Sequence, residues 1–274
     1  MGFKCGIVGL PNVGKSTLFN ALTASKNAEA ANFPFCTIDP NIGIVDVIDD
    51  RLDQLSKLSN SKKKIYTNIT FVDIAGLVKG ASKGEGLGNK FLSHIREVDA
   101  IIHLVRCFES DQITHVNSKI NPVEDLDTIK TEIILSDIDV IQKKLDKGKK
   151  KLLDEKEIKI LEEKLNQLNK GDEVTSNNQT EIKLLSNLGL LSIKPKIIVC
   201  NVDEESLAEG NIFTKSIKEA HPNEKIVIIC ADIEDQIMGL DNNERETFMK
   251  EIGLSKTGLN QLIKEGYELL NLDT

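Results

Sequence analysis

The chain has 274 residues, of which 40% are hydrophobic and 28% are charged, and its formal net charge at pH 7 is −8. This length suits one large domain or two modest ones. The acidic balance excludes a globally basic nucleic-acid-binding protein, although it is compatible with a local basic patch. The five cysteines form no C-x-x-C pair, which predicts free thiols and a cytoplasmic, reducing setting. No run approaches the ~18 apolar residues of a membrane span, and a strand predicted to start near the N-terminus leads us to expect no signal peptide.

The first predicted elements form an anion-binding unit. Phe3–Val8 is typical of a strand, Gly9–Ser16 matches the P-loop pattern G-x-x-x-x-G-K-[ST] without a gap, and Thr17–Ala24 begins a helix. Backbone N–H groups of such a loop point at phosphate oxygens, and the dipole of the following helix favours negative charge. We expect Lys15 to reach the β- and γ-phosphates as a catalytic group and the Ser16 hydroxyl to bind Mg²⁺. The other residues of this segment expected to contact the nucleotide are Asn12, Val13, Gly14 and Thr17.

Further apolar runs along the chain predict a parallel sheet. Those after the second are nearly continuous in Ile, Val, Leu and Cys, which is the composition of strands that helices bury on both faces. Helical stretches separate the runs, so we predict an α/β fold, a doubly wound and mostly parallel sheet of the P-loop NTPase (G-domain) kind. The predicted strands are Phe3–Val8, Ile42–Val47, Ile69–Asp73, Ala100–Val105, Lys196–Cys200 and Lys225–Cys230.

The region from Thr128 to Lys170 interrupts this alternation, because it is rich in charge and has no strand pattern. Its apolar residues recur at spacings of 3, 4 and 7 in two series, which is typical of narrow coiled-coil seams. We predict an antiparallel helical hairpin over residues 128–189, inserted into a nucleotide-binding domain made of residues 1–127 and 190–274. The alternative is one long amphipathic helix against the sheet. The two series are Ile134, Ile138, Ile141, Leu145 and Leu152, and Ile158, Leu161, Leu165 and Leu168.

Two motifs extend the phosphate side of the predicted site. Asp73 ends the strand Ile69–Asp73 and begins the sequence Asp-Ile-Ala-Gly. In P-loop NTPases an Asp at this point holds the Mg²⁺ sphere, here expected through water, and a nearby glycine, Gly76, lets the backbone meet the γ-phosphate. Thr37 lies between the first helix and the next strand, where a threonine would complete the Mg²⁺ shell. An ordinary loop hydroxyl is the alternative for Thr37.

Two departures from a typical GTPase bear on hydrolysis and on the choice of base. Leu77 stands where Ras-type enzymes have a glutamine that orients the attacking water, and a leucine cannot hydrogen-bond water. GTPases read guanine with Asn-Lys-x-Asp after the fifth strand, whereas this chain has Asn201-Val202-Asp203-Glu204. Cys230-Ala231-Asp232 stands where such enzymes often carry Ser-Ala-Lys. Because losing a built hydrogen-bond pair removes strong discrimination, we expect weak guanine selectivity. The nucleotide contacts expected from these two segments are Asn201, Val202, Glu204, Cys230 and Ala231.

A resemblance to a known family follows from these motifs. Gly76–Asn89 resembles the glycine-rich switch II of Obg-family GTPases, and Gly9–Thr17 and Asn32–Ile38 fit the same family. Asn201-Val202-Asp203-Glu204 resembles the altered base motif of one branch, the YchF or Obg-like ATPases, and so does the helical insertion. The resemblance extends over the whole chain. The sequence is therefore identified as a member of this branch of the Obg-related P-loop NTPases of the TRAFAC class.

The resemblance implies an ATPase that prefers ATP to GTP and associates with ribosomes. It implies that His115 is a catalytic histidine that replaces the missing glutamine, since a histidine can orient or deprotonate water near neutral pH. A surface-loop histidine is the alternative. Phe108 is implied to lie near the adenine, with packing against a neighbouring helix as the alternative. The family also has a C-terminal TGS domain, which we do not expect in a sequence that ends at Thr274.

Six lysines crowd the predicted tip of the hairpin, namely Lys143, Lys144, Lys147, Lys149, Lys150 and Lys151. A phosphate-rich partner such as ribosomal RNA would favour this charge through counterion release, while a solvated helical face is the alternative. The sequence thus predicts a ribosome-associated ATPase that acts as a nucleotide-dependent switch. The rival interpretations are an Obg-type GTPase of relaxed base specificity, in which Asp203 reads guanine, and a non-hydrolysing nucleotide-dependent binding module. No sequence pattern assigns an oligomeric state or a membrane partner.

Overall fold

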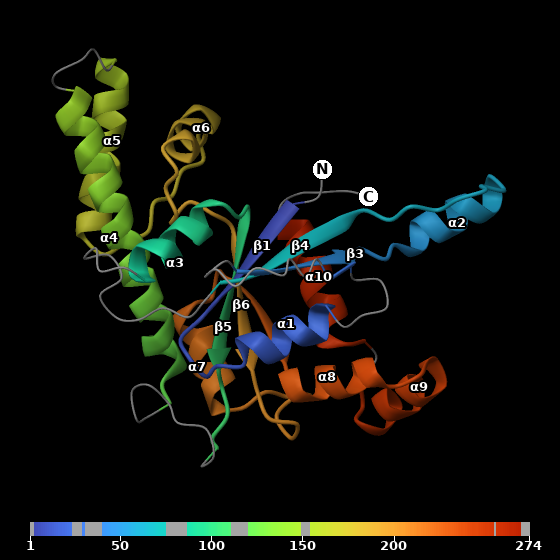
Figure 1. Cartoon of the computed structure of the whole chain (residues 1–274). Coiled ribbons are helices and arrows are strands. Elements are labelled where there is room, and N and C mark those ends of the chain that lie inside the picture. The colour runs from blue at the N-terminus through green and yellow to red at the C-terminus, as the bar shows by residue number, and fades with distance from the viewer. Residues whose placement is uncertain are drawn as a thin grey trace. The chain divides into compact units, whose positions relative to one another are not determined.

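The computed structural model describes residues 3–23, 29–30, 40–74, 87–110, 120–148, 154–254 and 256–269 (Figure 1). The chain divides into two compact units. Unit 1 comprises Met1–Gly76, Val98–Val123 and Pro195–Thr274, and unit 2 comprises Leu77–Glu97 and Glu124–Lys194.

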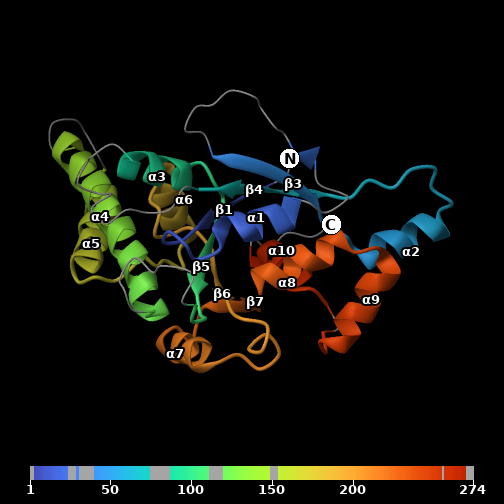
Figure 2. The same ribbon diagram turned by 60° about the horizontal axis from the view of Figure 1, so that its bottom comes forward.

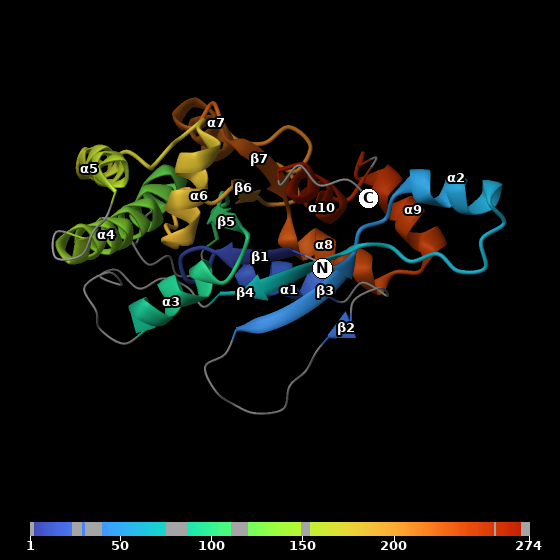
Figure 3. The same cartoon turned by 90° about the horizontal axis from the view of Figure 1, so that it is seen from above.

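Unit 1 is built around one sheet, in which the described residues form seven strands in the order β2-β3-β4-β1-β5-β6-β7. β1 pairs in parallel with β4 and β5, β5 with β6, and β6 with β7 (Figures 1 and 3). The predicted mostly parallel α/β sheet is therefore confirmed. The strands are β1 (Phe3–Val8), β2 (Glu29–Ala30), β3 (Asn41–Asp46), β4 (Asn68–Asp73), β5 (Ala100–Arg106), β6 (Lys196–Asn201) and β7 (Lys225–Ile229).

The β2–β3 edge of the sheet departs from the parallel pattern. β3 pairs antiparallel with β4, and the two-residue β2 pairs antiparallel with β3. An antiparallel strand can be half exposed, and the first two residues of β3 are exposed, whereas every residue of β5 is buried. The sequence does not predict β2, because two residues are too few to carry a periodic pattern.

Several helices of unit 1 pack against the sheet or against one another. α1 (Lys15–Thr23) lies beside α8 (Ala231–Gly239), and α10 (Gly258–Leu269) packs against β6 and β7 (Figure 2). The rings of Phe3 and Tyr267 are 6.0 Å apart, which joins α10 to β1 as well. Among the described residues, no helix has the length and apolar character needed to cross a membrane. The other helices of this unit are α2 (Asp50–Leu58), α7 (Ile212–Ala220) and α9 (Asn242–Glu251).

Unit 2 is helical, and its core joins two long helices. α4 (Pro122–Gly148), whose first two residues belong to unit 1, lies side by side with α5 (Glu155–Asn169) (Figures 1 and 2). Both predicted apolar series meet in this core, so the region forms two packed helices and not one long helix against the sheet. Leu152 lies outside the described residues. The buried members of the two series are Ile134, Ile141, Leu145, Leu161 and Leu168.

The boundary of the helical unit differs from the expected domain boundary. α3 (Leu87–Arg96) belongs to unit 2, although the expected division places it in the nucleotide-binding domain. Arg96 Nη2 donates a hydrogen bond to Ser136 Oγ of α4 at 2.7 Å, and Lys194 Nζ donates to the Arg96 carbonyl at 3.1 Å. These contacts join residues at least 40 positions apart in the sequence, and for that reason spacing along the chain does not predict them.

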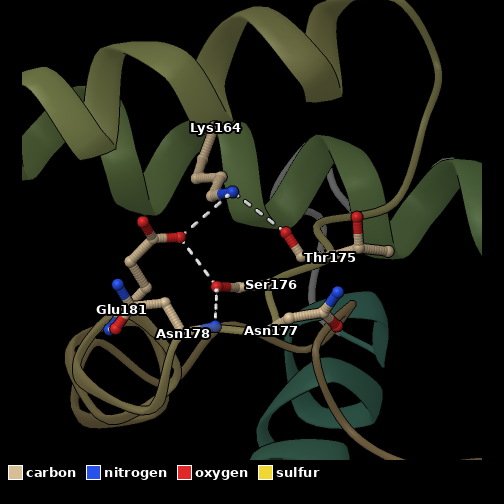
Figure 4. Close-up of a pocket in the computed structure, with 6 residues that line it drawn as sticks. All are labelled: Lys164, Thr175, Ser176, Asn177, Asn178 and Glu181. Atoms are coloured by element: carbon tan, nitrogen blue, oxygen red, sulfur yellow. Dashed lines mark hydrogen bonds and ion pairs between the residues drawn. The ribbon is translucent and has the colours of Figure 1, made fainter.

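A polar pocket of about 670 Å³ lies between α5 and the loop that leads into α6 (Gln179–Asn187) (Figure 4). The buried Lys164 donates to the Thr175 carbonyl at 2.9 Å and lies 3.4 Å from Glu181 Oε2, which accepts from Ser176 Oγ at 2.7 Å. The opposite charges of Lys164 and Glu181 offset each other. The polar groups of the pocket thus hold the loop after the hairpin against α5. The lining residues are Lys164, Thr175, Ser176, Asn177, Asn178 and Glu181.

Candidate functional site

The sequence-predicted site segments meet at one edge of the sheet in unit 1. β1, β4, β5, β6 and β7 run in the same direction, so their carboxyl ends share that edge, where ligands of open α/β sheets bind. The P-loop follows β1, and Asp73 ends β4. Phe108 comes two residues after β5, Asn201 ends β6 with Val202 next, and Cys230 follows β7 and is the N-cap of α8.

The P-loop backbone takes a conformation that requires special residues. Asn12 and Gly14 have positive φ angles of 63° and 97°, and only glycine and, less often, asparagine adopt such angles at low cost. A side chain at Gly14 would also collide with the Asn201 amide. α1 starts at Lys15, and its N–H groups face the loop, as an anion-binding helix N-terminus requires. Val13 is buried, while Ser16 is exposed and Thr17 is partly exposed on the first turn of α1.

Lys15 and Asp73 place two opposite charges in a largely buried setting. Lys15 is 9% exposed, and its ammonium donates to the Leu10 carbonyl at 2.8 Å. Burial lowers the pKa of Lys15, and Asp73 opposes that shift. Burial raises the pKa of Asp73, opposed by Lys15 and by a hydrogen bond from Asn41. Ionisable side chains with perturbed pKa values at a strand end are typical of functional sites, because a bound ligand can supply an opposite charge beside each of them.

The donor set at this end of the site fits a hard divalent cation. The Ser16 hydroxyl and the Asp73 carboxylate are oxygen ligands, and Mg²⁺ in phosphate-binding sites takes one or two such protein groups and fills its sphere with water and phosphate oxygens. The described residues contain no cluster of three or more His, Cys, Asp or Glu side chains that would hold a metal by themselves. The set thus matches a metal that arrives with a nucleotide. Thr37 and Gly76 lie outside the described residues, as do Leu77 and His115.

Asn201 joins the P-loop to the β7–α8 connection. Its Nδ2 donates to the Val13 carbonyl at 3.0 Å, and its Oδ1 accepts from the Ala231 N–H at 3.0 Å. The side chain is almost fully buried, with 4% exposure. Both ends of the amide are therefore used within the protein, and Asn201 joins two loops that follow different strands, β1 and β7. The sequence predicts its place in the site but not this bridging role.

Two of the other residues of the altered base motif, Val202 and Asp203, make hydrogen bonds within the protein. Asp203 Oδ1 accepts from the Ser206 N–H at 2.9 Å and so caps the turn that follows β6. Val202 is buried, and its N–H donates to the Ile229 carbonyl at 2.8 Å. Glu204 is exposed. Burial raises the pKa of Cys230, and the negative charges of Asp232 and Glu204 add to this effect. Glu204 therefore lies near Cys230, on the β7 side of the site.

Two residues that sequence reasoning does not single out hold the loop after β5. Arg106 Nε donates to the Phe108 carbonyl at 3.0 Å, and the Arg106 guanidinium carbon is 4.7 Å from the centre of the Phe108 ring. Asn211, the N-cap of α7, donates from Nδ2 to the Cys107 carbonyl at 2.7 Å. For Arg106 a signal exists in the sequence, since a charged residue directly follows the apolar run Ala100–Val105. For Asn211 no local signal points to Cys107, which is 104 positions away.

Comparisons with known proteins agree with this geometry. Residues 4–170 match a family described as "50S ribosome-binding GTPase". "Ribosome-binding ATPase YchF" of Bacillus subtilis is 48% identical over 285 residues, covering 100% of this chain and 78% of the relative. The protein of the same name from Escherichia coli O157:H7 is 48% identical, covering 100% and 77%. A solved structure, "Structure of the Schizosaccharomyces pombe YchF GTPase", has a TM-score of 0.83 and 34% identity, covering 98% of this chain and 76% of that one. The bacterial relatives are named ATPases and the solved structure is named a GTPase, so the preferred base must be inferred from the residues of the site.

The buried ammonium of Lys15 generates a prediction. Lys15→Met should weaken binding of Mg²⁺–ATP by about 100-fold, which corresponds to the ~3 kcal/mol upper range for a hydrogen bond to a charged group. The free energy of unfolding should not fall, because burial of the charge already disfavours the ammonium. Titration calorimetry and urea unfolding measure the two quantities. Lys4→Met, at the one exposed residue of β1, is the matched control and should change neither.

Proposed function

The chain belongs to the YchF family of P-loop NTPases, and on that premise we propose that it binds ATP in preference to GTP, hydrolyses it slowly and binds ribosomes as a nucleotide-dependent switch. The observation that carries the proposal is a complete P-loop joined by Asn201 to a base motif that lacks the guanine-reading residues. Ribosome binding is supported by the names of the bacterial relatives. A ribosome partner implies work in the cytoplasm.

On the phosphate side, each residue has a distinct task. The N–H groups of the P-loop and of the first turn of α1 cradle the phosphates, and Lys15 turns from the Leu10 carbonyl to the β- and γ-phosphates. Ser16 and, through water, Asp73 would hold Mg²⁺, and Thr37 would complete the set. When bound, Mg²⁺ neutralises charge that develops on the phosphates. Gly76 lets the backbone approach the γ-phosphate.

On the base side, the altered motif favours adenine by removing what guanine needs. Glu204 is one methylene longer than the aspartate of guanine-reading enzymes, and a paired carboxylate contact depends on distance. Asp203 is the remaining candidate for reading guanine, but one of its carboxylate oxygens caps the turn at Ser206. Phe108 offers an aromatic ring beside the base, and Cys230 and Ala231 line the β7 side.

We predict that ATP binds at least several-fold more tightly than GTP. Asp203→Ala should leave the ratio of the two dissociation constants unchanged, because Asp203 acts in the turn and not on the base. Calorimetric titration of the wild type and of the variant with both nucleotides measures this. A preference for GTP that Asp203→Ala abolishes would instead establish the Obg-type GTPase with relaxed specificity.

Water activation must come from a group other than Leu77, and we assign it to His115. His115→Ala should slow single-turnover hydrolysis of ATP by about tenfold or more, within the ~10²–10⁴ scale of general acid–base effects, while the dissociation constant stays near that of the wild type. His221→Ala is the control, since His221 follows α7 and precedes β7, at the sheet edge opposite the site. Equal rates in the two variants would return His115 to an ordinary loop residue. No turnover in the wild type would favour the non-hydrolysing binding module.

We propose that the lysines expected at the tip of the hairpin contact ribosomal RNA, although Lys149, Lys150 and Lys151 lie outside the described residues. Changing Lys147, Lys149, Lys150 and Lys151 to Glu should leave ATP turnover intact, weaken co-sedimentation with ribosomes and flatten its salt dependence. A control of equal charge change reverses four exposed lysines of unit 1, namely Lys62, Lys63, Lys215 and Lys218. Equal co-sedimentation of the tip variant and the parent at every salt concentration would show that the tip is only a solvated face.

A further inference from the structure

We propose that Arg106 is a positioning residue that sets the affinity of the site for the base of the nucleotide, by holding Phe108 and the loop after β5 in place. The inference rests on the proposed function, in which Phe108 lies beside the base. It adds a residue that contacts neither the phosphates nor the metal, and it gives that residue a role in affinity but none in hydrolysis.

The guanidinium of Arg106 makes three contacts with one short loop. Nε donates to the Phe108 carbonyl at 3.0 Å, and Nη2 donates to the Ser110 carbonyl at 3.3 Å. The guanidinium carbon is 4.7 Å from the centre of the Phe108 ring, within the range of a cation–π contact. Arg106 is 1% exposed, whereas Phe108 and Ser110 are partly exposed, so the two hydrogen bonds are partly buried. The side chain thus fixes both the main chain and the ring of Phe108.

The same loop is tied to the P-loop through Asn201. The Cys107 N–H donates to the Asn201 carbonyl at 2.7 Å, and the Asn201 amide bonds to the Val13 carbonyl. Asn211 Nδ2 holds the Cys107 carbonyl from the α7 side at 2.7 Å. A continuous set of hydrogen bonds therefore leads from the loop of Phe108 to the loop that cradles the phosphates. The position of the ring is set relative to the P-loop, as a base contact requires.

The chemistry of these contacts requires arginine. A guanidinium is planar and presents donors at fixed angles, so Nε and Nη2 can bond two carbonyls while the flat face lies over a ring. A lysine ammonium is a single charged point and cannot bond both carbonyls and lie over the ring in this way. Burying a charge costs stability, and burial lowers the pKa of Arg106. An apolar residue would suit a strand end of β5 better if packing were the only demand.

Phe108 keeps part of its surface exposed, although Arg106 covers one face of the ring. The exposed part is what a purine base would stack on, and aromatic stacking on a base is worth enough to change affinity about tenfold. If the Phe108 ring could rotate freely, it would lose conformational entropy when the base bound, and this loss would offset part of the affinity gained from stacking. Arg106 removes this cost before the nucleotide arrives.

The test compares two probes, Mg²⁺–ATP and inorganic tripolyphosphate with Mg²⁺, which share the phosphates and differ in the base. Arg106→Lys should weaken ATP binding about tenfold and tripolyphosphate binding less than twofold, both measured by calorimetry. The single-turnover rate at saturating ATP should stay within twofold of the wild type, which separates positioning of the base from catalysis. Arg51→Lys is the matched control, because Arg51 is exposed and pairs with Asp49 on the α2 segment.

Phe108→Leu should give the same pattern of losses, and the double variant Arg106→Lys/Phe108→Leu should bind ATP no more weakly than Phe108→Leu alone. Several results would overturn the inference: equal weakening of ATP and tripolyphosphate, additive losses in the double variant, or unchanged ATP affinity in either single variant. Arg106→Gln keeps a donor in similar volume, and loss of folding in both Arg106 variants would likewise overturn it by assigning Arg106 to the core. Failure of the wild type to bind ATP would instead refute the proposed function.

Discussion

The two hydrogen bonds of the Asn201 side chain are the constraint on which the nucleotide site depends. A buried amide must satisfy both its donor and its acceptor, and a group left unpaired costs about 1–3 kcal/mol. Asn201 meets this demand with the Val13 carbonyl of the P-loop and the Ala231 N–H at the start of α8. Gly14 has no side chain at the point where Asn201 approaches. Asn201 therefore couples the positions of the P-loop, the base motif and the β7–α8 connection, so a shift in one of these segments would displace the others.

Near this bridge, the site holds two groups of opposite charge, Lys15 and Asp73, in a largely buried setting. Burial pushes the pKa of Lys15 down and that of Asp73 up, which means that the surroundings disfavour both charged forms. In the proposed function, a nucleotide with its metal would add an anion beside Lys15 and a cation beside Asp73. Perturbed pKa values of this kind are common at functional sites, which agrees with the roles proposed for both side chains. Arg106 is another buried charged side chain, and its guanidinium donates to the Phe108 and Ser110 carbonyls after β5.

Unit 2 depends on a different kind of interaction. α4 and α5 are held together by an apolar core that also takes in Val174, Leu185 and Leu190. Polar contacts add to this core. The carboxylate of Asp137 on α4 accepts hydrogen bonds from the Leu191 and Ser192 N–H groups at 2.9 Å each, where the chain returns from α6 towards β6. The unit thus has its own folding determinants, separate from those of the nucleotide site.

The sequence alone determined the features that depend on local pattern. Residues 9–16 predict the P-loop, and the apolar runs predict the buried parallel strands. The spacing of Ile134, Ile141, Leu161 and Leu168 predicts the paired helices. Each of these features depends on residues that are close together in the sequence. Tertiary structure alone decided the antiparallel edge at β2 and β3, the grouping of α3 with the helical unit, the turn that occupies Asp203 and the hold of Arg106 and Asn211 on the loop of Phe108. Pairing partners such as Asn211 and Cys107 are separated by 104 positions. Contacts over such distances are selected by the packing of the whole sheet, and no local periodicity records them.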